Sequence, residues 1–204
     1  MFRSLTPVVR ALLYSNLIVY LAQTLTGDTL TDLFALWPWN SRSLYGAPPF
    51  EPWQIVSYAF LHANLLHLFS NMLALYMFGP DSERVLGSRR FTQYYFACVI
   101  GAALTQMLVM SRVDPGPAPT VGASGGIFGV LLFYGMAFPH RRILLLFPPI
   151  PMPAWLFVTL YGIFELVQGV FGTTQGVAHF AHLGGLATGC LMILYWRRQT
   201  PRDL

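Results

Sequence analysis

Long uncharged stretches alternate with short charged segments along the whole chain. From one charged residue to the next, the uncharged stretches are residues 11–27, 52–80, 91–111, 115–140, 143–164 and 166–196. A helix needs roughly 20 mostly apolar residues to cross the hydrocarbon layer of a membrane. The pattern therefore predicts a polytopic membrane protein with about six spanning helices and short loops.

Breaks in this pattern set the limits of the predicted helices. We expect them to cover residues 8–25, 57–78, 91–110, 124–138, 154–170 and 177–196. Gly79-Pro80 predicts the end of the second helix, and Pro139 requires a short fourth helix, because proline interrupts helical hydrogen bonding. Residues 26–52 form a long first external loop whose tryptophans favour the membrane surface. Residues 1–204 are thus expected to form a single all-α membrane domain.

Composition and charge agree with this assignment. Only 10% of the residues are charged, against about 25% in soluble domains. Ten of the twelve arginines fall in one alternate set of loops, namely Arg3, Arg10, Arg84, Arg89, Arg90, Arg141, Arg142, Arg197, Arg198 and Arg202. Because cytoplasmic loops carry the excess of basic residues, both termini are predicted to be cytoplasmic. The net charge of +4 therefore reflects topology, and no nucleic-acid partner is expected.

Polar side chains inside the predicted helices are the functional candidates, because placing them in a membrane is costly. Ser124 lies in Gly122-Ala123-Ser124-Gly125-Gly126, where the fourth helix begins. Its small neighbours leave the hydroxyl uncovered, and the free N–H groups of a helix start can stabilise an oxyanion. Glycines also serve close helix packing in membranes, and from this motif alone packing is the favoured interpretation.

His182 supplies the general base that Ser124 lacks. Small residues line one face of each of the two helices, with Gly125 and Gly129 on the fourth and Gly185 and Gly189 on the sixth. Packing these faces together brings the His182 ring towards the Ser124 hydroxyl, which is the arrangement of a nucleophile and its base. His179 lies one turn further out, where we expect a structural role.

His67 and Asn71 are four residues apart and share one face of the second helix. Both side chains can donate hydrogen bonds, as an oxyanion hole requires, although hydrogen bonding between helices is an alternative role. His62 is expected at the membrane boundary, where it would hold the adjoining loop.

Glu165 follows Ser124 and precedes His182, which is the chain order of one class of hydrolase triads. Three roles are open: holding the loop of residues 171–176, being a neutral buried acid, or orienting His182. We favour the first two, so Glu165→Gln is expected to keep most activity. The histidines and Cys98 also suggest a metal site. However, the chain has no H-E-x-x-H motif, Cys98 is placed far from His67, and we expect no metal.

Three motifs together resemble the rhomboid family of intramembrane serine proteases. They are His67-x-x-x-Asn71, Gly122-x-Ser124-Gly125 and Ala181-His182-x-x-Gly185, in this order along the chain, and Glu83-Arg84-x-Leu86-Gly87 adds to the likeness. The resemblance implies a six-helix rhomboid-like bundle in which Ser124 and His182 act as a dyad without a carboxylate. It further implies an oxyanion hole formed by His67, Asn71 and the Ser124 N–H, with Phe128 packed against the histidine ring.

The resemblance also implies a function. The chain would cut transmembrane segments of other membrane proteins within the lipid bilayer, after small side chains and without a cofactor. The alternatives are a catalytically silent rhomboid-like protein that binds transmembrane clients, and a small channel or transporter. No organellar targeting segment is visible, so a bacterial inner membrane is expected.

The sequence leaves two features of the loops open. Trp53-Gln54 matches the family's loop motif only in part, because arginine is usual at position 54, and the anchor of the first loop is therefore undetermined. Gly169, Gly172 and Gly176 suggest that the connection between the fifth and sixth helices is a gate.

Overall fold

The computed structural model describes residues 4–40, 46–110, 112, 118–144, 149–171 and 178–199. Within them, the helices are α1 Pro7–Thr26, α2 Thr29–Phe34, α4 Gln54–Ser57, α5 Leu65–Met110, α6 Ser124–Ala137, α7 Ala154–Phe171 and α8 His179–Gln199, with a 3₁₀ turn, η1, at Tyr58–Phe60. An antiparallel pair, β1 Arg142–Leu144 and β2 Pro151–Pro153, lies between α6 and α7. The sequence predicted no sheet, because strands of three residues are too short to show an alternating pattern.

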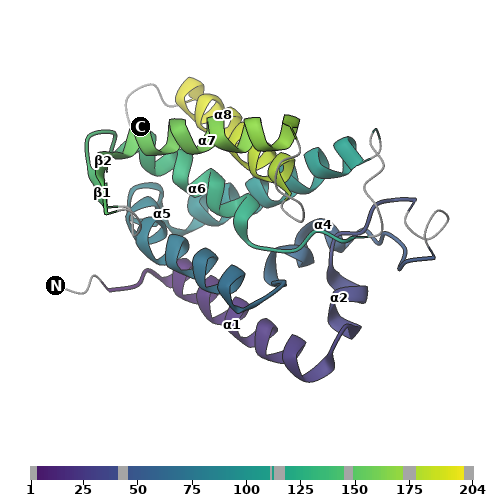
Figure 1. Ribbon diagram of the computed structural model, residues 1–204. Helices are drawn as coiled ribbons and strands as arrows, with labels where there is room; N and C mark the ends of the chain where they lie inside the picture. The colour runs from purple at the N-terminus through teal and green to yellow at the C-terminus, as the bar shows by residue number, and fades with distance from the viewer. Residues whose placement is uncertain are drawn as a thin grey trace.

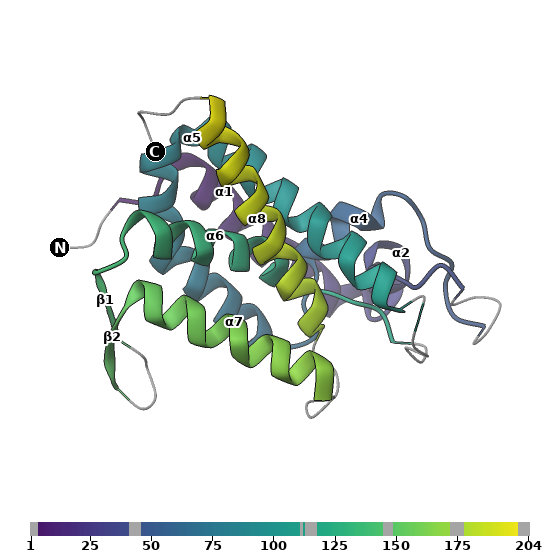
Figure 2. The same ribbon diagram turned by 90° about the horizontal axis from the view of Figure 1, so that it is seen from above.

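The helix α6 lies at the centre of the bundle in both views (Figures 1 and 2) and contacts α5, α7 and α8. Ten of its 14 residues are buried. The helix begins at Ser124 and ends at Ala137, before Pro139, as the sequence predicts. A helix of this length measures about 21 Å, so α6 is shorter than the layer of about 30 Å that spanning helices cross.

The course of α5 corrects one prediction. Gly79-Pro80 does not end a helix, because helical structure continues to Leu86 and is interrupted only at Gly87, with φ 74° and ψ 153°. A positive φ of this kind favours glycine. Pro80 is tolerated inside the helix because one missing backbone hydrogen bond can be offset by close packing with neighbouring helices in membrane proteins. Gly79 provides such packing, since a Cβ there would lie 2.7 Å from Val9 Cγ2 of α1.

The interruption at Gly87 lets the chain turn back on itself. The Tyr58 hydroxyl, which precedes the first half of α5, donates a hydrogen bond of 2.8 Å to the carbonyl of Val99 in the second half. The rings of Phe60 and Phe96 are also neighbours, with centroids 6.4 Å apart. The two halves of α5 therefore take the places of the second and third helices predicted from the sequence, although the first half begins at Leu65 instead of residue 57, where α4 ends just before η1.

The turn at Gly87 lies beside the first residues of α1. Both carboxylate oxygens of Glu83 accept hydrogen bonds from α1, at 3.1 Å from Val8 N and 2.9 Å from Val9 N. The first N–H groups of a helix have no partner within the helix, and a carboxylate there also complements the helix dipole. Glu83, which is 2% exposed, thus fixes the start of α1 against α5.

Two of the arginines predicted to be cytoplasmic contact the segments at the chain's two ends. Arg84 donates a hydrogen bond of 2.6 Å to the carbonyl of Ser4, just before α1. Arg90 lies over the ring of Trp196 near the end of α8, 5.8 Å from its centroid. The starts of α1 and of the second half of α5 and the end of α8 therefore share one end of the bundle, while the side of the membrane on which this end lies stays a prediction.

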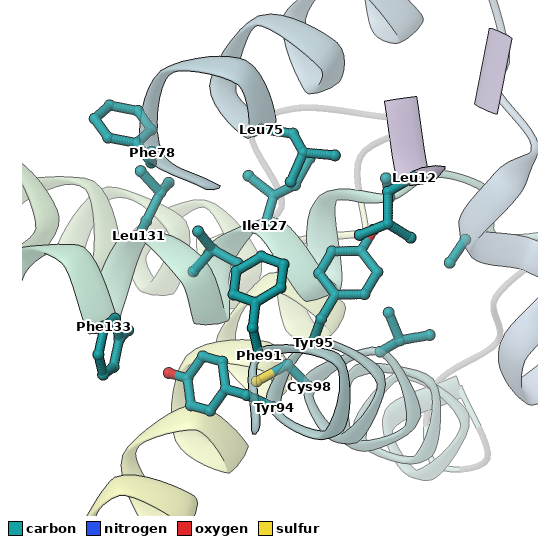
Figure 3. Close-up of a cluster of buried hydrophobic side chains, with 14 of the residues drawn as sticks. Leu12, Leu75, Phe78, Phe91, Tyr94, Tyr95, Cys98, Ile127, Leu131 and Phe133 are labelled. Atoms are coloured by element: carbon teal, nitrogen blue, oxygen red, sulfur yellow. The ribbon is translucent and has the colours of Figure 1, made fainter. Parts of the chain in front are cut away.

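Apolar side chains from α1, α5 and α6 form the core between these helices. Figure 3 shows part of this cluster, with Leu12 of α1 and Leu131 of α6 facing residues of α5 that include Phe78, Phe91 and Tyr95. Phe91 is fully buried and Tyr95 is 1% exposed. Burial of this apolar surface fixes the position of α6 relative to α5.

Three helices in the described part of the chain are long and apolar enough to cross a membrane: Pro7–Thr26, Leu65–Met110 and Ala154–Phe171. Because Leu65–Met110 has 46 residues and an interruption, it is long enough to cross twice. The helices α6 and α8 are not among these three, since α6 has 14 residues and the histidines at the start of α8 lower its mean hydropathy. Apolar helices of this length indicate an integral membrane protein, and the count of six spans stays a prediction.

The long connection between α1 and α5 is anchored by Gln54, which is 1% exposed. Its Oε1 accepts a hydrogen bond of 3.2 Å from Trp37 N, and its Nε2 donates to the carbonyls of Leu33 at 3.4 Å and Pro49 at 3.3 Å. An amide offers both an acceptor and donors, whereas a guanidinium offers donors only. Gln54 therefore supplies the acceptor for Trp37 N that an arginine at this position would lack.

We expect Gln54→Leu to destabilise the loop, because the buried Trp37 N–H loses its acceptor, and a buried unsatisfied group costs about 1–3 kcal/mol. Thermal unfolding in detergent would show a lower midpoint. Gln93→Leu is the matched control, since Gln93 is exposed on α5, and should leave the midpoint unchanged. Equal midpoints for Gln54→Leu and wild type would contradict the anchoring role.

Candidate active site

Ser124 is the first residue of α6 and follows a turn that requires glycine. Gly122 has φ +124°, and a Cβ at this position would lie 2.7 Å from His67 Nε2 and 3.7 Å from Ser124 Oγ. The Gly122 N–H donates a hydrogen bond of 3.0 Å to the carbonyl of Tyr58, which holds the turn in place. Ser124 is therefore presented at the start of a buried helix, where backbone N–H groups lack helical partners.

The structure brings His182 of α8 to Ser124. His182 Nε2 lies 2.7 Å from Ser124 Oγ, although the two residues are 58 positions apart. The Phe128 ring stacks on the imidazole, with centroids 4.3 Å apart and an angle of 11° between the planes. The stacked ring limits rotation of the imidazole and keeps Nε2 directed at the hydroxyl. A serine and a histidine in this geometry can form a nucleophile and its general base.

Glycines on α6 and α8 allow this contact. A Cβ at Gly185 would lie only 2.0 Å from the carbonyl oxygen of Gly125, and a Cβ at Gly189 would lie 3.3 Å from the Cα of Gly129. The two glycine faces expected from the sequence are therefore in direct backbone contact. This close approach of the helices sets the distance between the Ser124 hydroxyl and the His182 ring.

His67 lies at the same turn, and Asn71 lies one helical turn after it. His67 Nδ1 accepts a hydrogen bond of 3.5 Å from Ala63 N, which favours the tautomer with the ring proton on Nε2. The Nε2–H is then a donor beside Gly122 and Ser124. The Asn71 side chain is buried and donates a hydrogen bond of 2.9 Å to the His67 carbonyl, which leaves one amide hydrogen for another acceptor.

His62 holds the loop through its backbone. Its N–H donates to Gln23 Oε1 at 3.0 Å, and its carbonyl accepts from Gln23 Nε2 at 3.5 Å. The ring is buried and lies edge-on to His67, with centroids 5.0 Å apart. A cavity of about 500 Å³ lies beside His62 and is lined by residues of α1, α2 and the loops, including Gln23 and Thr31.

Glu165 of α7 contacts both histidines of α8. Its Oε2 lies 2.6 Å from His179 Nδ1 and 2.9 Å from His182 Nδ1, and the side chain is buried. Of the three roles that the sequence leaves open, this geometry favours the orientation of His182, which the sequence alone favours least. Chain order was the only sequence signal for this contact. The loop of residues 172–177 lies outside the described residues, and so do Gly172 and Gly176 of the suggested gate.

The same three residues offer ligand atoms within 4.8 Å of one another, a spacing that a metal ion can use. The hydrogen bonds to Glu165 Oε2 already pair both Nδ1 atoms. Cys98 contacts α6 instead, since a Cβ at Gly129 would lie 2.3 Å from Cys98 Sγ. The described arrangement is explained by hydrogen bonding between the carboxylate and the two rings.

Comparison with known proteins places the chain in a family. The Rhomboid domain matches residues 49–199, which is more than half of the chain. The chain therefore belongs to the rhomboid family.

Several relatives carry names that describe them as rhomboid proteins. The chain is 34% identical to rhomboid protein 1, mitochondrial, of Saccharomyces cerevisiae over 139 residues, which is 67% of this chain and 40% of that protein. It is 27% identical to rhomboid protease GlpG of Yersinia pestis over 199 residues, which is 97% of this chain and 66% of that protein. It is 32% identical to rhomboid-like protein 11, chloroplastic, of Arabidopsis thaliana over 162 residues, which is 74% of this chain and 55% of that protein. The chain thus spans between two fifths and two thirds of the length of these curated relatives.

Proposed function

We propose that the protein is an intramembrane serine endopeptidase with Ser124 as nucleophile and His182 as general base. The observation that carries the proposal is the distance of 2.7 Å between His182 Nε2 and Ser124 Oγ at the start of a buried helix. Membership of a family whose relatives include a protein named as a rhomboid protease supports it.

The proposed reaction proceeds through an acyl-enzyme. Ser124 Oγ attacks a peptide carbonyl while His182 Nε2 takes the hydroxyl proton, and His182 then gives this proton to the leaving amine. The charge on the carbonyl oxygen would be stabilised by the Ser124 N–H, by His67 Nε2–H and by the free amide hydrogen of Asn71. Water then attacks the ester, and the serine is released by the reverse proton transfers.

The substrate would be a transmembrane segment of another protein. A regular helix hides its carbonyls in backbone hydrogen bonds, so cleavage requires a site that unwinds easily, at glycine, proline or small polar residues. We further propose six spans in a single domain, with both termini cytoplasmic, in a bacterial inner membrane. The short length of α6 supports a nucleophile below the membrane surface, in a cavity that admits water.

Cleavage of a tagged transmembrane segment by the purified full chain in detergent tests the proposal. The segment should contain an Ala-Gly pair near one membrane surface, and we expect a cut within or beside the segment. A fluorophosphonate probe reports the nucleophile independently of substrate choice, and we expect it to label Ser124. Labelling without cleavage of that segment would support the nucleophile and send the search to other segments. Neither cleavage nor labelling would overturn the proposal in favour of a silent protein that binds transmembrane clients.

A further inference from the structure

Glu165 is an unusual residue for its position. It belongs to α7, where Ala154 and Glu165 are the buried residues. Most of the helix presents large apolar side chains outward, among them Leu160, Ile163 and Phe164. A buried carboxylate is costly unless it is paired, and packing of α7 on α8 would not by itself require one.

The partners of Glu165 give the carboxylate a chemical role. An ionised carboxylate only accepts hydrogen bonds, so His182 Nδ1, at 2.9 Å from Glu165 Oε2, must carry a proton. In the neutral ring, Nε2 is then the acceptor, and this is the atom that lies 2.7 Å from Ser124 Oγ. Only this tautomer can take the serine proton.

We propose that Glu165 is a positioning residue for proteolysis, which acts through His182 and extends the pair to a Ser124–His182–Glu165 triad. This inference rests on the proposed function. When Ser124 Oγ bonds to the substrate carbonyl carbon, its proton moves to His182 Nε2, and the carboxylate stabilises the imidazolium while remaining ionised. The C–N bond then breaks as the proton passes to the leaving amine, so the proton balance involves no change at Glu165.

His179 completes the arrangement from the other side. Its Nδ1 lies 2.6 Å from the same Glu165 oxygen, and its ring is T-shaped to that of His182, with centroids 6.3 Å apart. The residues His179 and His182 are three positions apart on α8, so both rings face α7. His179 therefore holds the carboxylate in place, while the carboxylate orients His182 and stabilises its imidazolium.

Glu165→Gln is the direct test, because it keeps the side-chain volume and removes the charge. We expect kcat to fall by about 10²- to 10⁴-fold, with KM unchanged, since Glu165 is buried against His179 and His182. Glu165→Asp keeps the charge at a shorter reach and should lie between Glu165→Gln and wild type. A Glu165→Gln protein with wild-type kcat would overturn the proposal.

A matched control separates positioning from a structural role. Glu83 is also 2% exposed and accepts hydrogen bonds from Val8, Val9 and Ser88, at a distance from the site. Glu83→Gln should lower the unfolding midpoint and leave kcat per folded molecule unchanged. If Glu165→Gln also lost activity only in proportion to its folded fraction, Glu165 would be structural and the proposal would be wrong.

The tautomer of His182 provides a readout that needs no substrate. In protein labelled with ¹⁵N-histidine, we expect His182 to carry its proton on Nδ1, and Glu165→Gln to shift the population towards Nε2–H. His182→Ala assigns the signal. The wild type could cleave no substrate while Glu165→Gln still moved the His182 proton from Nδ1 to Nε2. In that case the proposed function would fail and the positioning role of Glu165 would stand. An unchanged tautomer, or activity that a chelator removed and zinc restored, would overturn the role.

Discussion

Ser124→Ala is expected to reduce cleavage by about 10⁴- to 10⁶-fold, because it removes the atom that bonds to the substrate carbonyl. The structure indicates little effect on folding, since the hydroxyl is replaced by hydrogen and the hydrogen bond lost is that to His182 Nε2. The measurement is the initial rate of cleavage of a tagged transmembrane segment, together with the unfolding midpoint. A residual rate within tenfold of wild type would show that another group is the nucleophile.

Ser15→Ala serves as the matched control for this variant. Ser15 is a half-buried serine of α1 whose hydroxyl donates to the Ala11 carbonyl within the same helix. Its removal should change neither the rate nor the midpoint. Similar losses in both variants would point to an effect of handling in detergent, and the assignment of Ser124 would then lose its support.

Gly185→Ala is expected to impair both stability and activity. The new methyl group would lie 2.0 Å from the carbonyl oxygen of Gly125, which is backbone and cannot rotate away. Overpacking of this kind costs typically about 1–3 kcal/mol. The helices α6 and α8 would have to separate, and a displacement near 1 Å between catalytic groups can cost about 10²-fold in rate. The unfolding midpoint and the cleavage rate should therefore both fall.

Gly162→Ala is the matched substitution on α7. A Cβ at Gly162 would meet Leu186 Cδ1 at 3.4 Å, which is an ordinary contact. Alanine is favoured over glycine inside a helix by roughly 0.5–1 kcal/mol, so this variant should be as stable as wild type or slightly more stable. If Gly185→Ala behaved like Gly162→Ala, the backbone contact between α6 and α8 would not set the site geometry.

Helix positions were predictable where proline and glycine act locally. Pro139 ended α6 as expected, because the residue before proline is biased away from helical dihedral angles. Gly79-Pro80 misled the same reasoning. There the packing of α1 against Gly79 and the core residues around it maintained the helix, and Gly87 made the turn instead. Local signals thus failed where contacts between distant segments outweighed them.

The loop anchor illustrates a second limit of sequence reasoning. In the sequence, Gln54 is visible only as a departure from a family motif. This departure does not show how the loop is anchored. Its partners Leu33, Trp37 and Pro49 lie 5 to 21 residues away, and backbone groups carry no residue-specific pattern. No spacing rule could therefore have found them.

The sequence by itself determined the apolar character of the helices, the arginine pattern, and the serine, histidine and glycine residues of the candidate site, because these follow from composition and helical periodicity. Only the tertiary structure decided that Glu165 faces His182. Glutamate on an apolar helix has the same sequence signature whether it holds a loop, stays neutral or orients a histidine. Which of these roles applies depends on the face that α7 turns towards α8. That orientation is set by packing between the helices.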